Sequence, residues 1–285
     1  MNTSNYATLW MEATPLPFGL IGSSRELLRS AVINFLSVIY RSSTDTFLRC
    51  LYCHNVFDDQ KKDFEVLIAG LKRIGQFIDT DTCIDMLNRK KVVDGRYFHL
   101  SFDDGFRNNY TNALPILVRQ EVPAIFFVPS SLMDADWVAA REYSLETTRY
   151  RSVIELLKWS DLRQMIASGF EIGSHTRTHA QFSAISEDPV LLEDEILGSK
   201  RELEKYLEVE CKYISWPYGR LTDADNKSLK MVEDVGYLAC FGAYRGTINP
   251  KQTDIFSIPR HHFEVHWPIS HVNFFARGNM EKVVR

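Results

Sequence analysis

The sequence predicts an α/β protein whose parallel strands form a closed or nearly closed (β/α) barrel, preceded by an N-terminal helical extension. From about residue 46 onward, short apolar segments alternate with longer segments of helical periodicity, a pattern typical of a parallel sheet built from βα units. The length of this series favours a barrel. The catalytic groups of such barrels gather at the C-terminal ends of the strands, so we expect functional residues directly after the β-segments.

The individual elements follow from local composition. Residues 124–128, Ala-Ile-Phe-Phe-Val, are fully apolar, as expected of a strand that is covered on both faces. Residues 189–207 carry many charges, so one face of that predicted helix should be solvated. In chain order, the predicted strands are residues 48–56, 97–102, 124–128, 169–173, 213–216, 237–241 and 255–263, and the predicted helices are residues 61–74, 108–120, 159–168 and 189–207.

The composition is that of a globular protein with a large core, with 45% apolar and 25% charged residues. A length of 285 residues exceeds the usual size of one domain, but α/β barrels often reach it as one unit. We therefore predict an extension at residues 1–45 and one barrel domain at residues 46–285. The net charge of −4 provides no broad cationic field for a polyphosphate backbone, which argues against a nucleic-acid partner. The sequence does not indicate an oligomeric state.

The extension contains an apolar segment that is too short to span a membrane. A transmembrane helix needs roughly 20 apolar residues, whereas the apolar run covers only residues 31–40. We predict an amphipathic helix at residues 24–40, which either packs on the barrel or makes a peripheral contact with a membrane surface. Residues 1–19 lack the basic start of a secretory signal and contain Pro15 and Pro17, so we expect a cytoplasmic protein.

The cysteines fit a reducing compartment, because there are five of them and their spacings are not those of a secreted disulfide framework. Cys50 and Cys53 form a C-x-x-C motif. It lies within a predicted strand, whereas redox-active examples usually lie at a helix start. We expect a structural role there, with a redox or metal-binding role as the alternative.

Two adjacent carboxylates follow the strand predicted at residues 97–102. These are Asp103 and Asp104, and Gly105 comes next. Neighbouring side chains of a strand face opposite ways, so both carboxylates can reach one site only if the backbone bends at Asp104, and Gly105 permits that bend. This arrangement points to separate roles, although Asp-Asp-Gly alone is also a common turn sequence.

His175 and His179 lie four residues apart, directly after the strand predicted at residues 169–173. Imidazole suits zinc and similar divalent ions, and three protein ligands leave open the position that hydrolysis requires. Together with Asp104, the two histidines supply that number. Without the carboxylate pair, two histidines at this spacing outside a helix would be better explained as structural.

The third motif is Ser-Trp-Pro-Tyr-Gly at residues 215–219. Pro217 fixes the chain there, and Tyr218 can present its backbone N–H toward the site, as an oxyanion donor does. A proline turn without a catalytic part is the alternative.

In this order, the three motifs resemble those of the polysaccharide deacetylase family, the NodB-homology domain. The matching segments are Ser-Phe-Asp-Asp-Gly, then Ser-His-Thr-Arg-Thr-His, then Pro-Tyr-Gly. The resemblance covers roughly residues 46–265, and the first two motifs are highly specific when they occur together. It implies a distorted (β/α) barrel of the NodB-homology type.

The resemblance also implies a metal-dependent hydrolase that removes an acyl group from the nitrogen of an amino sugar. Asp103 would be the general base, while Asp104, His175 and His179 would hold a divalent metal ion, commonly zinc. The Tyr218 N–H would stabilise the oxyanion, and an acid would protonate the leaving amine.

Two positions depart from the family pattern. Many relatives begin the third motif with an Arg that orients the base, where this chain has Ser215. The last family motif, Leu-x-His, supplies the acid in relatives. If Ile258 takes the Leu position here, Arg260 falls at the His position.

Alternate residues of a strand share a face, so Arg260 and His262 should act together. We expect Arg260 to tether Asp103 and His262 to serve as the acid. His54, at the end of the first strand, and His261 are the other candidates for the acid.

We expect an N-deacetylase that acts in the cytoplasm on a nucleotide-linked or lipid-linked amino-sugar precursor of a surface polysaccharide. One alternative uses the same residues to remove a formyl group or to open a cyclic amide or imide. Another is a sugar-binding relative that has lost turnover. The intact Asp103 argues against the last alternative, and the irregular final motif argues for it.

Overall fold

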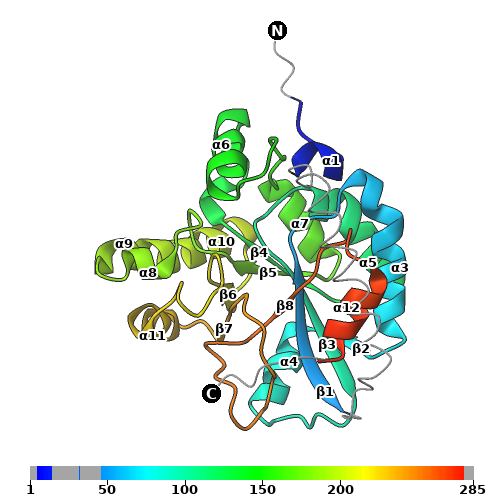
Figure 1. Ribbon diagram of the computed structural model, residues 1–285. Helices are drawn as coiled ribbons and strands as arrows, with labels where there is room; N and C mark the ends of the chain where they lie inside the picture. The colour runs from blue at the N-terminus through cyan, green and yellow to red at the C-terminus, as the bar shows by residue number, and fades with distance from the viewer. Residues whose placement is uncertain (1–4, 15–31, 33–45, 279–285) are drawn as a thin grey trace.

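The computed structural model describes residues 5–14, 32 and 46–278. In this part of the chain, an 8-stranded parallel sheet curls around a central core, and helices cover its outer side (Figure 1). The strand order is β7-β6-β5-β4-β3-β1-β8, and β2 pairs with the start of β3. This arrangement confirms the predicted distorted (β/α) barrel. The strands are β1 (Phe47–Cys53), β2 (Gln76–Ile78), β3 (Arg96–Phe102), β4 (Ile125–Val128), β5 (Glu171–Ser174), β6 (Tyr213–Ser215), β7 (Ala239–Phe241) and β8 (His261–His262).

The segment after β7 closes the barrel. Ile258 pairs with Phe241 of β7, and the two residues of β8 pair with Leu51 and Tyr52 of β1. The strand predicted at residues 255–263 is therefore present only in part. Pro259 interrupts it, because proline has no N–H to donate to a strand ladder.

The helices predicted from periodicity are all present. The segment at residues 189–207 is helical throughout, with a π-helical stretch, η5 (Asp194–Gly198), in its middle. Within the described residues, β2 and six α-helices of four to nine residues were not predicted: α1, α4, α6, α8, α11 and α12. Asp79 caps α4 by accepting the N–H of Thr82 at 2.7 Å. The α-helices are α1 (Trp10–Ala13), α3 (Lys61–Lys72), α4 (Thr80–Leu87), α5 (Leu114–Gln120), α6 (Trp137–Glu142), α7 (Trp159–Ala167), α8 (Phe182–Ile185), α9 (Pro189–Glu193), α10 (Ser199–Leu207), α11 (Asn226–Asp234) and α12 (Ile269–Ala276).

The sheet separates two apolar cores. Leu48 and Cys50 of β1 belong to an inner core inside the barrel, which also contains Phe127. Leu51 and Cys53 belong to the outer core between the sheet and the surrounding helices. Because side chains alternate along a strand, Cys50 and Cys53 point to opposite sides of the sheet. The C-x-x-C motif therefore does not bring its two sulfur atoms together.

The described part of the N-terminal extension packs on the barrel. The ring of Trp10 in α1 lies 6.0 Å from that of Phe57 and 4.2 Å from that of His266, measured between centroids. Apart from residue 32, the amphipathic helix predicted at residues 24–40 lies outside the described residues, and the domain boundary at residue 46 stays a prediction. No helix within the described ranges combines the length and apolarity needed to cross a bilayer.

Candidate functional site

A cleft of about 680 Å³ opens at the end of the barrel where the strands finish. It brings together most of the site residues predicted from the sequence, which lie far apart along the chain. A wall of the cleft is formed by residues 147–150 together with Thr14, which follows α1. The predicted residues that line it are His54, Asp103, Asp104, His175, His179 and Tyr218.

Asp103 and Asp104 leave β3 on the two sides of a backbone bend. Asp104 has a φ of 73° and Gly105 a φ of 69°, so both lie in the left-handed region that side chains disfavour. A non-glycine residue held there costs roughly 1–3 kcal/mol, which the surrounding structure must offset. Tyr143 contributes by donating its hydroxyl to the Asp104 carbonyl at 3.3 Å. The bend directs both carboxylates toward the cleft.

His175 and His179 direct their Nε2 atoms to the same carboxylate oxygen of Asp104, at 3.4 and 3.3 Å. His175 Nδ1 donates to the carbonyl of Ser215 at 2.8 Å, so the lone pair of this ring is on Nε2. Burial lowers the pKa of His179, which keeps that ring neutral and able to bind a metal. One carboxylate oxygen and two imidazole nitrogens, all within 4.8 Å of one another, fit a divalent ion with an open position.

Arg260 lies buried beneath the cleft and binds both carboxylate oxygens of Asp103. Its two terminal nitrogens donate to Asp103 Oδ1 at 2.8 Å and to Oδ2 at 2.7 Å. The same nitrogens also donate to Ser101 and Ser215, and Nε donates to the Gly242 carbonyl at 2.6 Å. The guanidinium is thus fully engaged, and the plane of the Asp103 carboxylate is fixed.

This pairing sets the charge of Asp103. Burial alone would raise the pKa of Asp103, but Arg260, followed by His175, outweighs burial and holds the pKa below its usual value. Asp103 is therefore ionised at neutral pH, in the form that accepts a proton.

The loop at residues 217–219 lies beside the two histidines. Pro217 is buried, and Tyr218 has a φ of 63°. Gly219 has a φ of 70°, and a Cβ at this position would lie 2.0 Å from the Cβ of Ala243, so the loop requires glycine there. The ring of Tyr218 lies 5.1 Å from that of His179. This contact places the Tyr218 side chain beside His179, one of the three residues that could hold a metal.

A family model described as polysaccharide deacetylase matches residues 90–240, more than half of the chain and including all three motifs. The chain belongs to the polysaccharide deacetylase family.

Two curated relatives carry related names. This polysaccharide deacetylase family member is 25% identical over 178 residues to YxkH of Bacillus subtilis (strain 168), whose name assigns it to the polysaccharide deacetylases provisionally. It is 28% identical over 127 residues to the chitooligosaccharide deacetylase of Sinorhizobium fredii (strain NBRC 101917 / NGR234). These matches cover 62% and 44% of the chain. They cover 56% and 48% of the relatives, so the chain spans about half their length.

Solved structures share the fold of this family member. IcaB from Ammonifex degensii superposes with a TM-score of 0.68 at 20% identity, over 81% of this chain and 97% of that one. The BpsB deacetylase domain from Bordetella bronchiseptica gives a TM-score of 0.63 at 21% identity, over 77% of this chain and 96% of that one.

Within the polysaccharide deacetylase motifs, the departure at Ser215 has a structural counterpart. Ser215 Oγ accepts a hydrogen bond from Arg260 at 2.6 Å, and the guanidinium comes from the last strand segment rather than from the third motif. The cation beside Asp103 is thus retained from a different position in the chain.

The candidate acids are placed differently from the sequence expectation. His54 and Glu264 line the cleft, whereas His262, the acid favoured from the sequence, is not among the lining residues. Glu264, two residues further on, contacts both rings: its Oε1 lies 2.7 Å from His262 Nε2 and 3.4 Å from His54 Nδ1. Burial alone would lower the pKa of His54, but the carboxylates of Asp104 and Glu264 outweigh it and raise the pKa to about 9. His261, the remaining candidate, is buried.

Glu195 is a positioning residue that the sequence did not reveal. Its buried carboxylate accepts the backbone N–H groups of Arg177 and Thr178 at 3.0 and 2.9 Å, and the Thr178 hydroxyl at 2.6 Å. These bonds hold the loop between His175 and His179, in which His179 has a φ of 68°. Nothing in the local sequence distinguishes Glu195 from the other charges of its helix.

Proposed function

We propose that this protein is a metal-dependent hydrolase that removes the N-acetyl group of an amino sugar, with zinc as the metal. The observation that carries the proposal is an ionised carboxylate held next to a three-residue metal-binding set. Asp103 is fixed by Arg260, and the adjacent Asp104 meets His175 and His179 in the same cleft. The family membership agrees with this chemistry.

Each residue has a distinct part in the proposed reaction. Asp104 and the two histidines would hold a divalent ion, which when bound would provide Lewis-acid chemistry at the site of acetyl transfer to water. Asp103 accepts a proton from the attacking water, and the Tyr218 N–H donates to the carbonyl oxygen as negative charge develops on it. His54 donates a proton to the departing amine, and Glu264 orients His54.

The assignment of His54 predicts a specific change in the pH profile. A general acid works in its protonated form, so activity persists below the pKa of His54 and is lost as the pH rises through it. Glu264 contributes to raising that pKa. We expect His54→Ala to lower kcat by roughly 10²–10⁴-fold and to abolish the alkaline limb of the pH–rate profile, where the rate falls as the pH rises. Glu264→Gln should move that limb to lower pH, and rates measured from neutral to alkaline pH report both effects.

His262→Ala and His261→Ala are the matched controls. We expect His261→Ala to lose little activity and His262→Ala to keep the alkaline limb. If His262→Ala removes the limb and His54→Ala leaves it in place, the acid comes from the last strand and the assignment of His54 is wrong.

The cleft also supports a narrower proposal for the substrate. Arg149 and Arg220 both line it and are exposed, and guanidinium groups are suited to binding phosphate oxygens. We infer a nucleotide-linked or lipid-linked amino-sugar precursor of a surface polysaccharide, deacetylated in the cytoplasm.

A substrate panel tests both levels of the proposal. The zinc-loaded protein is incubated with nucleoside-diphosphate N-acetyl amino sugars, with N-acetyl amino-sugar oligomers and with N-formyl analogues, and released acetate or formate is quantified. We expect acetate from the diphosphate-linked sugars. Release from oligomers alone would overturn the precursor proposal, and formate without acetate would identify a deformylase. No release from any substrate would overturn the hydrolase proposal.

A further inference from the structure

A second group of metal-binding side chains lies on the floor of the barrel, at the end opposite the cleft. Cys50 of β1 and His99 of β3 are register partners on adjacent strands, and Cys83 comes from α4, whose apolar side chains join the inner core. All three side chains are buried. His99 precedes Asp103 by four residues along β3, a separation of roughly 13 Å at the rise of a strand. The group is therefore distinct from the site in the cleft.

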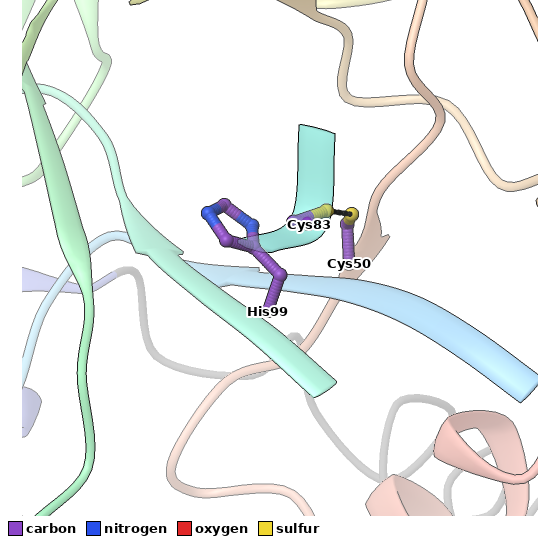
Figure 2. Close-up of side chains that lie close together, drawn as sticks. All are labelled: Cys50, Cys83 and His99. Atoms are coloured by element: carbon purple, nitrogen blue, oxygen red, sulfur yellow. Dashed lines mark hydrogen bonds between the residues drawn. The ribbon is translucent and has the colours of Figure 1, made fainter. Parts of the chain in front are cut away.

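The two sulfur atoms lie at a distance that suits a shared metal ion. Cys50 Sγ and Cys83 Sγ are 3.8 Å apart. Two sulfur atoms that each lie about 2.3 Å from a zinc ion, at a tetrahedral angle, are separated by about 3.8 Å. A ring nitrogen of His99 faces the same side as the two sulfur atoms (Figure 2). The three donor atoms lie within 4.8 Å of one another.

Hydrogen bonding leaves His99 in the form that binds a metal. Its Nε2 lies 3.1 Å from Thr80 Oγ1, and the Thr80 hydroxyl donates to the carboxylate of Glu171. Because the Thr80 proton is directed to Glu171, Thr80 Oγ1 accepts from His99 Nε2–H. The lone pair of the ring is then on Nδ1, a buried atom with no hydrogen-bond partner among the described residues. A metal-binding histidine almost always donates its other ring N–H to a hydrogen-bond acceptor, which fixes the tautomer, and Thr80 Oγ1 takes that place here.

The charges also balance at such a site. The charges of two thiolates, a neutral imidazole and a divalent ion sum to zero. A net charge of zero is the least costly state for a buried ionic group. Binding releases the two thiol protons to solvent and forms two sulfur–metal bonds. Three protein donors leave one position of a tetrahedron for a small ligand such as water.

We propose that Cys50, Cys83 and His99 bind a zinc ion that ties α4 to β1 and β3 at the barrel floor. The two cysteines are 33 residues apart in the chain. The ion would therefore link α4, which covers the floor of the barrel, to two strands of the sheet. The proposal is independent of the activity of the cleft, since none of its residues lines that cleft.

Cobalt substitution tests the proposal in the full-length protein. Cobalt bound to thiolate absorbs in the near ultraviolet by sulfur-to-metal charge transfer, whereas the site of Asp104, His175 and His179 contains no sulfur. Protein produced with cobalt under reducing conditions should bind about two equivalents and show this band. Cys50→Ser and Cys83→Ser should each lose the band and about one equivalent, while Asp104→Asn should lose an equivalent and keep the band.

Cys53→Ser is the matched control, because Cys53 lies on the same strand but faces the outer core. It should keep both the band and the metal content. The wild-type spectrum decides the question even if a variant fails to fold, since a wild-type protein without the band overturns the proposal. A wild-type mass lower by two hydrogens, without the band, would show a disulfide in place of the metal site and would also overturn it.

Discussion

Asp103→Asn is expected to lower kcat by roughly 10²–10⁴-fold while the cleft keeps its metal, as removal of a positioned base does. The amide of Asn cannot accept the proton of the attacking water. The metal-binding atoms belong to Asp104 and the two histidines and are unchanged. Initial rates of acetate release, combined with elemental analysis of the same preparation, separate loss of the base from loss of the ion.

His179→Ala is the contrasting variant, because it removes a metal-binding nitrogen and should lose most of the ion from the cleft. Asp103→Asn should also lower the free energy of unfolding, since Arg260 keeps its charge while the counter-ion is lost. Rates are therefore compared at a temperature well below both unfolding transitions. If Asp103→Asn lost the metal and Asp104→Asn kept it, the two carboxylates would have exchanged roles.

Arg260→Ala is expected to have the largest effect on stability, about 3–5 kcal/mol, because it leaves a buried carboxylate without its partner. Asp103, with its lowered pKa, contributes stability that is present above the unfolded pKa of about 3.9. That contribution is lost as the pH falls through the folded pKa. Without Arg260, burial dominates and the pKa of Asp103 rises. The acidic limb of the pH–rate profile, which reports the base, should then move to higher pH.

Arg260→Lys provides the graded comparison. Lysine keeps a positive charge but cannot donate to both carboxylate oxygens in one plane. The acidic limb of the pH–rate profile of Arg260→Lys should therefore lie between those of the wild type and Arg260→Ala. Chemical denaturation and pH–rate profiles of the three proteins measure both quantities. An unchanged acidic limb in Arg260→Ala would show that Arg260 does not control the charge of Asp103.

Most strands, the helices of strong periodicity and much of the site could be predicted from short-range patterns and motifs. The bend at Asp104 follows from two adjacent carboxylates before a glycine, and the structure shows it as a φ of 73°. The contact between Arg260 and Asp103 was expected from the resemblance to the family, by placing Ile258 at the Leu position of its last motif and applying the alternation of side chains. The catalytic roles of these residues stay predictions that the variants above test.

The remaining features depend on contacts between distant segments. The choice between His54 and His262 rests on Glu264, which contacts both rings and cannot be located from either strand alone. The Cys50–Cys83 contact joins a strand to a helix that was too short to predict. The C-x-x-C spacing drew attention to Cys53 instead, although that side chain faces the other way.

Thr14 lines the cleft, and the segment that carries it is joined to the residues that follow 147–150 of the same wall, by backbone bonds from Ala7 N to Val153 O and from Arg151 N to Ala13 O, both 2.7 Å. The residues before the first barrel strand therefore shape the opening through which a substrate enters. Trimming the chain at residue 46 would keep the strands but remove Thr14 from the wall that it shares with residues 147–150. All of the proposed reacting groups follow residue 46, so we expect such a shortened chain to differ in which substrates enter the cleft rather than in the reaction itself.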